Sequence, residues 1–182
     1  FYPEQTLRWM MLNGELFALH LATESKIIFE NNNIASNLFH LFQFKSSYIP
    51  IINEANLLAW TIIKYYSEIH KPDLCNKRLV WCIRTICAAN AASQKKNCFA
   101  AADIIKSVSV SDMDWVLAQK NNHEYSQRLI TKMIEFLHHH GLDQPEGVGR
   151  TKDIDDCLHL FGIGSMGYKF LRSLKVKNSL GY

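Results

Sequence analysis

The sequence predicts a mainly α-helical protein, an orthogonal bundle of several helices that carries a small helical module at its C-terminal end. Apolar residues recur every three or four positions through most of the stretch 53–141, which is the spacing of one helix face. Hydrophobic residues make up 48% of the 182-residue chain and charged residues 20%, the ordinary balance of a globular domain. One stretch rich in both Gly and Pro, GLDQPEGVGR at 141–150, separates a long helical body from a short end.

The first 33 residues predict one helix and leave a second element open. In YPEQTLRWMML, Pro3 suits the first turn of a helix, and Asn13-Gly14 ends it. In the next stretch, 15–33, Leu16 and Leu19 could form the apolar stripe of a helix. The segment KIIF, however, is followed by three asparagines, which is typical of a strand that enters a turn. The alternative to a helix here is one short β-hairpin near the N-terminus.

The middle of the chain predicts five consecutive helices, over 53–70, 76–93, 97–108, 111–122 and 123–141. Pro72 is expected to end the first of them, because proline disrupts a helix interior. Ser111 and Asp114 have the spacing of a capping box at the start of the fourth. Gly141, directly after HHH at 138–140, is the expected end of the fifth, where cations favour the helix C-terminus.

These patterns divide the chain into three expected parts. Residues 1–140 form a helical body for dimerisation or partner binding, 141–150 a loop or hinge, and 151–182 a basic C-terminal module. The net charge is only +3, but the last fourteen residues hold Lys169, Arg172, Lys175 and Lys177 and no acid. Such a basic end suits a polyanion, and it is also typical of a solvated helix face.

The segment GIGSMG at 162–167 spells G-x-G-x-x-G, the pattern of a dinucleotide-binding loop. That loop must follow a buried strand and open a helix of a βαβ unit. Here the preceding residues are acidic and helix-patterned, and only fifteen residues follow Gly167. The sequence therefore argues against a dinucleotide site. The acids of DIDD at 153–156 are expected to cap a helix rather than to bind a metal.

The stretch LFGIGSMGYKFLRSL resembles the helix-turn-helix of bacterial transcription regulators, over about 20 of the 182 residues. With Gly162 at the turn, the resemblance places Cys157, Phe161, Ile163, Tyr168 and Leu171 inward. Phe170 would be exposed, which departs from the pattern. The resemblance implies DNA contacts from the outward and following residues, Ser165, Met166, Lys169, Arg172, Ser173, Lys175 and Lys177. The alternative is a helix ended by Gly162, a glycine loop and a terminal basic helix.

Two functions from different classes are compatible with the sequence. The first is a DNA-binding transcriptional regulator that contacts DNA through the C-terminal helix-turn-helix. The second is a helical adaptor, subunit or chaperone of a larger assembly, because aromatic residues make up 12% of the chain and its Trp residues are spread over several helices. We expect a protein partner or homodimer in either case. The sequence contains no catalytic motif, so we expect neither an enzyme nor a cofactor.

The cysteines and the hydropathy pattern set further expectations. The five cysteines, 75, 82, 87, 98 and 157, contain no Cys-x-x-Cys pair and fall partly within apolar runs. We expect free thiols packed as small hydrophobes, no metal site and a reducing, cytoplasmic environment. No apolar run approaches 18 residues, so we expect no membrane span and no membrane partner.

Overall fold

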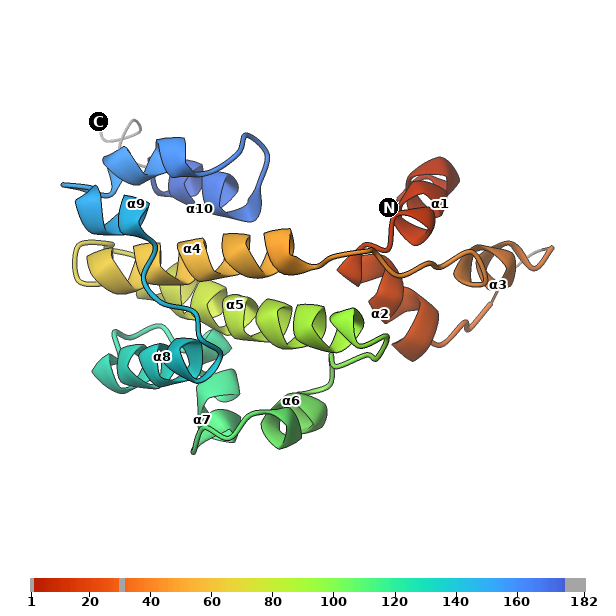
Figure 1. Cartoon of the computed structure of the whole chain (residues 1–182), viewed down its shortest axis with the longest axis horizontal. Coiled ribbons are helices and arrows are strands. Elements are labelled where there is room, and N and C mark those ends of the chain that lie inside the picture. Colours follow the sequence, from red (N-terminus) through yellow and green to blue (C-terminus); the bar gives the residue numbers. More distant parts are fainter. Residues whose placement is uncertain (1, 30–31, 176–182) are drawn as a thin grey trace.

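The computed structural model describes residues 2–29 and 32–175, and in these residues the regular structure is helical, without a strand (Figure 1). The mainly α prediction is therefore confirmed. The elements are α1 (Glu4–Leu12), α2 (Leu16–Glu24), α3 (Ile34–Phe39), α4 (Ile49–Tyr65), α5 (Pro72–Ser93), α6 (Ala101–Ser107), α7 (Met113–Ala118), η1 (Gln119–Asn121), α8 (Gln127–His139), α9 (Glu146–Arg150), η2 (Asp155–Leu160) and α10 (Met166–Lys175).

The two longest helices, α4 and α5, form an antiparallel pair through the middle of the molecule (Figure 1). Each buries an apolar stripe against the other, with Leu58 and Ile62 on α4 facing the core together with Leu79 and Ile83 on α5. Burying such side chains fully contributes about 1.5–3 kcal/mol each, so this pair supplies much of the stability of the fold. α2, α6, α8, α9 and α10 each contact α4 or α5 directly.

The remaining helices cover two sides of this pair. α9 and α10 pack on α4 along one side, whereas α8 contacts both α4 and α5 from the other (Figure 1). α8 buries Leu129, Met133 and Leu137 and ends at His139, with Gly141 in the left-handed conformation at φ +66°. A glycine tolerates this conformation without steric cost, so the expected helix end is confirmed.

The C-terminal segment shares its hydrophobic core with the α4–α5 pair. Val148, Phe161, Phe170 and Leu171 are all buried in the same cluster as the α4 and α5 side chains. The expected loop at 141–150 contains the short helix α9. The ammonium group of Lys64 on α4 donates hydrogen bonds to the carbonyl oxygens of Val148 and Thr151, at 2.8 and 2.6 Å and so ties the end of α9 to α4.

Helices α1, α2 and α3 form a separate lobe at the other end of the α4–α5 pair, which we call the N-terminal lobe, residues 2–29 and 32–48 (Figure 1). Tyr48 is fully buried at its base and donates a hydrogen bond from its hydroxyl to the Gly14 carbonyl at 2.9 Å. Gly14 has φ +61°, and a Cβ there would lie 2.4 Å from the Gln43 carbonyl oxygen. The turn between α1 and α2 therefore requires glycine.

The structure decides three local questions that the sequence raised, and it contradicts the capping box at Ser111. The KIIF segment is not a strand, since residues 26–29 belong to no regular element, so the described residues do not form the β-hairpin. The first of the central helices, α4, ends at Tyr65, before Pro72, and Pro72 itself occupies the first turn of α5, where its missing N–H costs nothing. Ser111 does not cap α7: the N-cap is Asp112 at φ +63°, without a side-chain cap bond, and its carboxylate pairs with Arg128 at 3.0 Å.

Candidate functional site

The turn that the glycine-rich segment forms leads directly into α10. Gly164 has φ +85°, and Ser165 follows as the N-terminal cap of α10, where its Oγ accepts a hydrogen bond from the Tyr168 N–H at 3.2 Å. The Met166 N–H donates to the Glu54 carboxylate of α4, with Oε1 at 2.8 Å. The N-terminus of α10, which would attract a phosphate, is thus engaged by a carboxylate of the same chain. Glu54 also fixes the start of α10 to α4.

α10 presents a buried apolar face and a polar face. Gly167, Phe170 and Leu171 are buried, at the i, i+3, i+4 spacing of one helix side. A Cβ on Gly167 would lie 2.1 Å from the Phe161 ring, so glycine is needed here for close packing. The helix-turn-helix resemblance implied that Phe170 would be exposed and that Ile163 would fill the turn. Instead, Phe170 is buried and Ile163 is 90% exposed.

The residues expected to contact DNA divide into two groups. Lys169, Arg172 and Ser173 are exposed, as the resemblance implied, although the Ser173 hydroxyl donates to the Phe170 carbonyl at 2.6 Å. Ser165 and Met166 are half-buried and do not point outward. Lys175 is the last residue of α10, and Lys177 lies outside the described residues.

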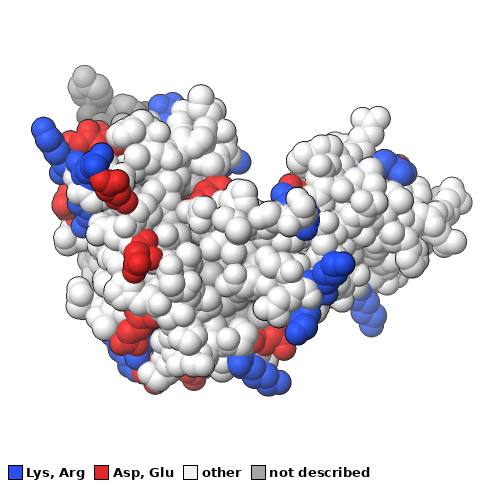
Figure 2. Space-filling view, viewed as in Figure 1, with Lys and Arg blue, Asp and Glu red and all other residues white. Residues whose placement is uncertain are grey.

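The surroundings of α10 are of mixed charge. The Lys71 ammonium donates to the Ser173 and Leu174 carbonyls at its C-terminal end, at 2.8 and 3.4 Å. Leu174 borders a hollow that is also lined by Glu68, Asp153 and Asp155. Figure 2 shows acidic and basic atoms side by side over this end of the molecule. Acids close to the C-terminal end of α10 weaken the positive potential that a nucleic-acid backbone needs.

η2 precedes this turn and is a 3-10 helix of six residues. Its N-cap is Ile154, without a side-chain cap bond. Just before it, Asp153 Oδ1 accepts a hydrogen bond from the Asp156 N–H at 2.9 Å, and the Asp156 carboxylate accepts from the Lys152 N–H at 2.9 Å. The DIDD acids therefore bind backbone N–H groups around the start of η2, but none of them is its N-cap residue. In the described part of the chain, no cluster of three or more His, Cys, Asp or Glu side chains is arranged to hold a metal ion.

A groove of about 530 Å³ lies between the N-terminal lobe and α10, on the surface of the α4–α5 pair. Figure 2 shows the surface hollowed at this place. We call it the central groove. It is lined by Glu15, Leu16, Phe17, His20, Ile51, Glu54, Trp81, Arg84, Thr85, Ala88, Phe99, Gly164, Ser165 and Met166. Five segments that are apart in the sequence therefore build one surface.

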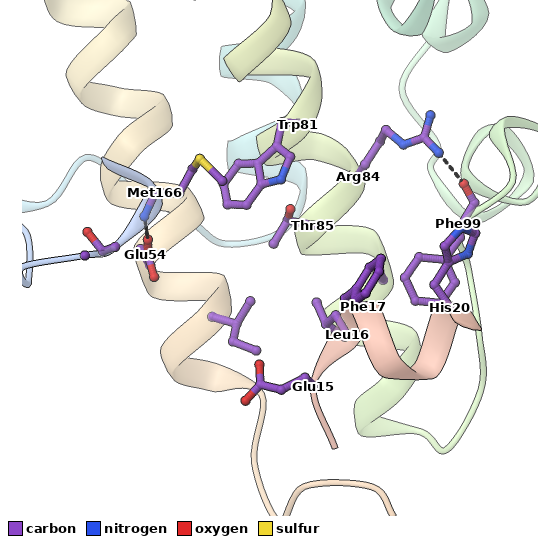
Figure 3. Close-up of a pocket in the computed structure, with 14 residues that line it drawn as sticks. Glu15, Leu16, Phe17, His20, Glu54, Trp81, Arg84, Thr85, Phe99 and Met166 are labelled. Atoms are coloured by element: carbon purple, nitrogen blue, oxygen red, sulfur yellow. Dashed lines mark hydrogen bonds between the residues drawn. The ribbon is translucent and has the colours of Figure 1, made fainter. Parts of the chain in front are cut away.

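Apolar and aromatic side chains form most of the walls of the central groove. Phe17 from α2 and Trp81 from α5 approach it from different elements, and Met166 lies beside Trp81 (Figure 3). The ring of Tyr2 packs against Phe17 with centroids 5.2 Å apart and extends the aromatic rim. Aromatic residues and methionine are enriched in protein interfaces, because they offer large contact areas and adapt in shape.

The charged groups of the central groove are held in place by hydrogen bonds and ion pairs. Glu15 pairs with Lys45 at 2.7 Å, and Glu54 accepts from Met166 as described. The Arg84 guanidinium donates to the Phe99 carbonyl at 2.8 Å, away from Glu54 (Figure 3). The groove therefore has a carboxylate region and an arginine region whose side chains are fixed in position.

The N-terminal lobe also exposes apolar surface. Eight of the twelve large hydrophobic side chains that are exposed in the described part of the chain fall between residues 2 and 34. Ile28 and Phe29, next to each other in the loop after α2, are 95% and 88% exposed. Trp9 and Leu12 line a second hollow that shares Glu15 with the central groove. Concentrated apolar exposure of this kind marks interaction surfaces.

All five cysteines are free and buried, which confirms their expected packing as small hydrophobes. Burial raises the pKa of the Cys75 and Cys87 thiols to about 12, so these groups remain protonated and poor nucleophiles at neutral pH. Among the described helices, none combines the length and the apolar character needed to cross a bilayer.

Comparisons with known proteins give no family for the chain: no family model matches, and neither the curated proteins nor the solved structures contain a match. The central groove was not predicted from the sequence. The sequence feature that comes closest to indicating it is the high content of aromatic residues, of which Trp81 and Phe17 line the groove.

Proposed function

We propose that this protein is a helical interaction module, an adaptor or subunit that binds another protein through the central groove and the adjoining surface of the N-terminal lobe. The observation that carries the proposal is that the central groove adjoins the N-terminal lobe, which holds most of the exposed large hydrophobic side chains of the described residues. A monomer that left such surface in water would forfeit about 25 cal/mol for each Å² of apolar area.

Site-specific photo-crosslinking in cells of the protein's source tests this proposal. A photoreactive phenylalanine analogue replaces Phe17, which is 41% exposed at the groove, or Tyr125, which is 46% exposed outside it. The proposal predicts a reproducible adduct with one protein from position 17 and none from position 125. Absence of an adduct at 17, or equal adducts at both positions, contradicts it.

A DNA-binding regulator is the second candidate, and the exposure of Lys169 and Arg172 on α10 favours it. Two such cations can each neutralise a backbone phosphate. The double charge reversal Lys169→Glu with Arg172→Glu should then weaken binding of random duplex DNA at least tenfold at low salt. It should also reduce the salt slope by about two units.

The control for this DNA experiment is a reversal of two exposed cations elsewhere, Lys95→Glu with Lys96→Glu, after α5. It changes the net charge equally and should leave a specific α10 interface intact. Fluorescence polarisation at low and high salt measures both variants and the unmodified protein. If the unmodified protein shows no salt-sensitive binding, or if both reversals act alike, α10 is not a DNA-reading element.

A further inference from the structure

The charges of the central groove specify the chemistry of its partner. This inference rests on the proposed function, because it concerns the same groove. We propose that the groove binds an apolar segment of a partner protein that places one basic side chain, Arg or Lys, against Glu54 and the Trp81 ring. The apolar walls supply contact area, and the carboxylate selects the residue at one position of the segment.

Glu54 is the carboxylate in the groove whose hydrogen-bond partner is neutral. Its Oε1 accepts from the Met166 backbone N–H at 2.8 Å, whereas Glu15 pairs with the Lys45 ammonium at 2.7 Å. A carboxylate offers about four lone-pair positions, so Glu54 can accept further hydrogen bonds. Within the described part of the chain, Arg84 is the one Lys or Arg that lines the groove, and its guanidinium donates to the Phe99 carbonyl.

An apolar partner that covers the groove removes water from Glu54. Desolvating an ionised carboxylate is costly unless a cation and hydrogen-bond donors replace the water. Among the described residues that line the groove, none brings a cation to Glu54, because Arg84 donates to the Phe99 carbonyl instead, so the partner must supply one. A partner with an apolar or acidic residue at this position would leave the charge buried and unpaired, and the groove would reject it.

Trp81 adds a second attraction for a cation. In Figure 3 its indole lies beside Met166, whose N–H binds Glu54, and Trp81 and Glu54 both line the groove, so a basic side chain of the partner can reach either group. A cation over an indole gains about 0.5–1 kcal/mol at exposed sites and more when it is desolvated. The carboxylate and the indole therefore favour the same kind of side chain at the same place.

Selection from a phage-displayed library of random peptides tests this inference. The unmodified protein should enrich peptides that combine apolar and aromatic residues with one Arg or Lys at a constant position.

The variant Glu54→Gln should lower the affinity for an enriched peptide at least about tenfold, because it removes the charge and keeps an oxygen for the Met166 N–H. Glu124→Gln makes the same charge change outside the groove and should leave the affinity within about twofold. Replacing the peptide's basic residue by Gln should weaken binding to the unmodified protein but hardly to the Glu54→Gln variant.

The variant Thr85→Trp separates failure of this inference from failure of the proposed function. Thr85 lines the groove, and an indole there occupies its space while circular dichroism checks the fold. Peptides that bind this variant as well as the unmodified protein do not use the groove, which overturns both proposals. If the peptides fail to bind the Thr85→Trp variant but do not share an Arg or Lys at one position, only the assignment of a basic residue to Glu54 is overturned. If the unmodified protein sediments as a dimer and Thr85→Trp dissociates that dimer, the groove is occupied by a second copy of this chain. This result would also overturn the assignment of a basic partner residue to Glu54.

Discussion

The carboxylate of Glu54 accepts a hydrogen bond from the backbone N–H of Met166, the first residue of α10, at 2.8 Å. The two residues are 112 positions apart in the chain. This contact places a negative charge at the positive end of the α10 dipole and joins the C-terminal segment to α4. It also sets one wall of the central groove, because both residues line it.

Removing this contact should loosen α10. Glu54→Ala deletes the acceptor and leaves the Met166 N–H without it, which should lower the free energy of unfolding by about 1–2 kcal/mol. Glu54→Gln keeps an oxygen acceptor and should cost less than about 1 kcal/mol. Urea denaturation followed by circular dichroism compares the two. Equal losses for both variants would show that the hydrogen bond contributes nothing to stability.

Gly167 should be intolerant of the smallest side chain. Gly167→Ala raises helix propensity by about 1 kcal/mol, but the new Cβ would lie 2.1 Å from the buried Phe161 ring. Overpacking of this kind costs about 1–3 kcal/mol, so we expect a net loss of stability. Gly149→Ala in α9 meets nothing within 4 Å and should be neutral or stabilising by up to about 1 kcal/mol. Thermal unfolding measures both, and a stabilised Gly167→Ala would contradict this packing.

Asn76 should be among the most sensitive polar positions. Its buried amide accepts from the Tyr66 hydroxyl at 2.7 Å and donates to the Asn122 and Glu124 carbonyls at 3.0 and 2.9 Å. Asn76→Ala leaves the Tyr66 hydroxyl and the Asn122 and Glu124 carbonyls without these partners, and should cost about 2–4 kcal/mol. The exposed control Asn53→Ala should change stability by only about 0.5 kcal/mol. Chemical denaturation measures the stability of both variants. Similar denaturation midpoints for the two would show that the hydrogen bonds of Asn76 do not stabilise the fold.

His140 should make stability fall in mild acid. Burial lowers its pKa below the ordinary 6.5, so the folded state binds fewer protons than the unfolded state once the pH drops below that value. The stability of the neutral form is present above pH 6.5 and is lost as the pH falls through the lowered pKa. His140→Asn should weaken this dependence. The free energy of unfolding is measured as a function of pH for the unmodified protein and for His140→Asn, and the two values should converge in acid. Parallel curves for the two proteins would contradict this role of His140.

The main helices could be predicted from the sequence because each has an apolar face of its own. Leu58 and Ile62 on α4, or Leu129 and Met133 on α8, repeat at helical spacing and are buried as expected. The same criterion, applied to α10, would have predicted Phe170 as buried, because Gly167, Phe170 and Leu171 share one face. The helix-turn-helix resemblance placed Phe170 outward and so obscured this simpler pattern.

The central groove could not be predicted because no local pattern contains it. Its walls come from Phe17, Glu54, Trp81 and Met166, which are distant in sequence and meet only through the packing of α2, α4, α5 and α10. The Glu54–Met166 contact is likewise a tertiary interaction, and neither residue has a sequence signal for it. The exposed basic residues Lys169 and Arg172 were found from the sequence, and their binding to DNA stays a prediction.

The most direct test of the central claim combines the crosslinking position with the filled groove. The photoreactive analogue at position 17 is introduced into the unmodified protein and into the Thr85→Trp variant, and the yield of the partner adduct is compared in the same cells. If the central groove is the docking site, filling it with an indole should abolish the adduct while the protein remains folded. An adduct of unchanged yield in the Thr85→Trp variant would contradict the account.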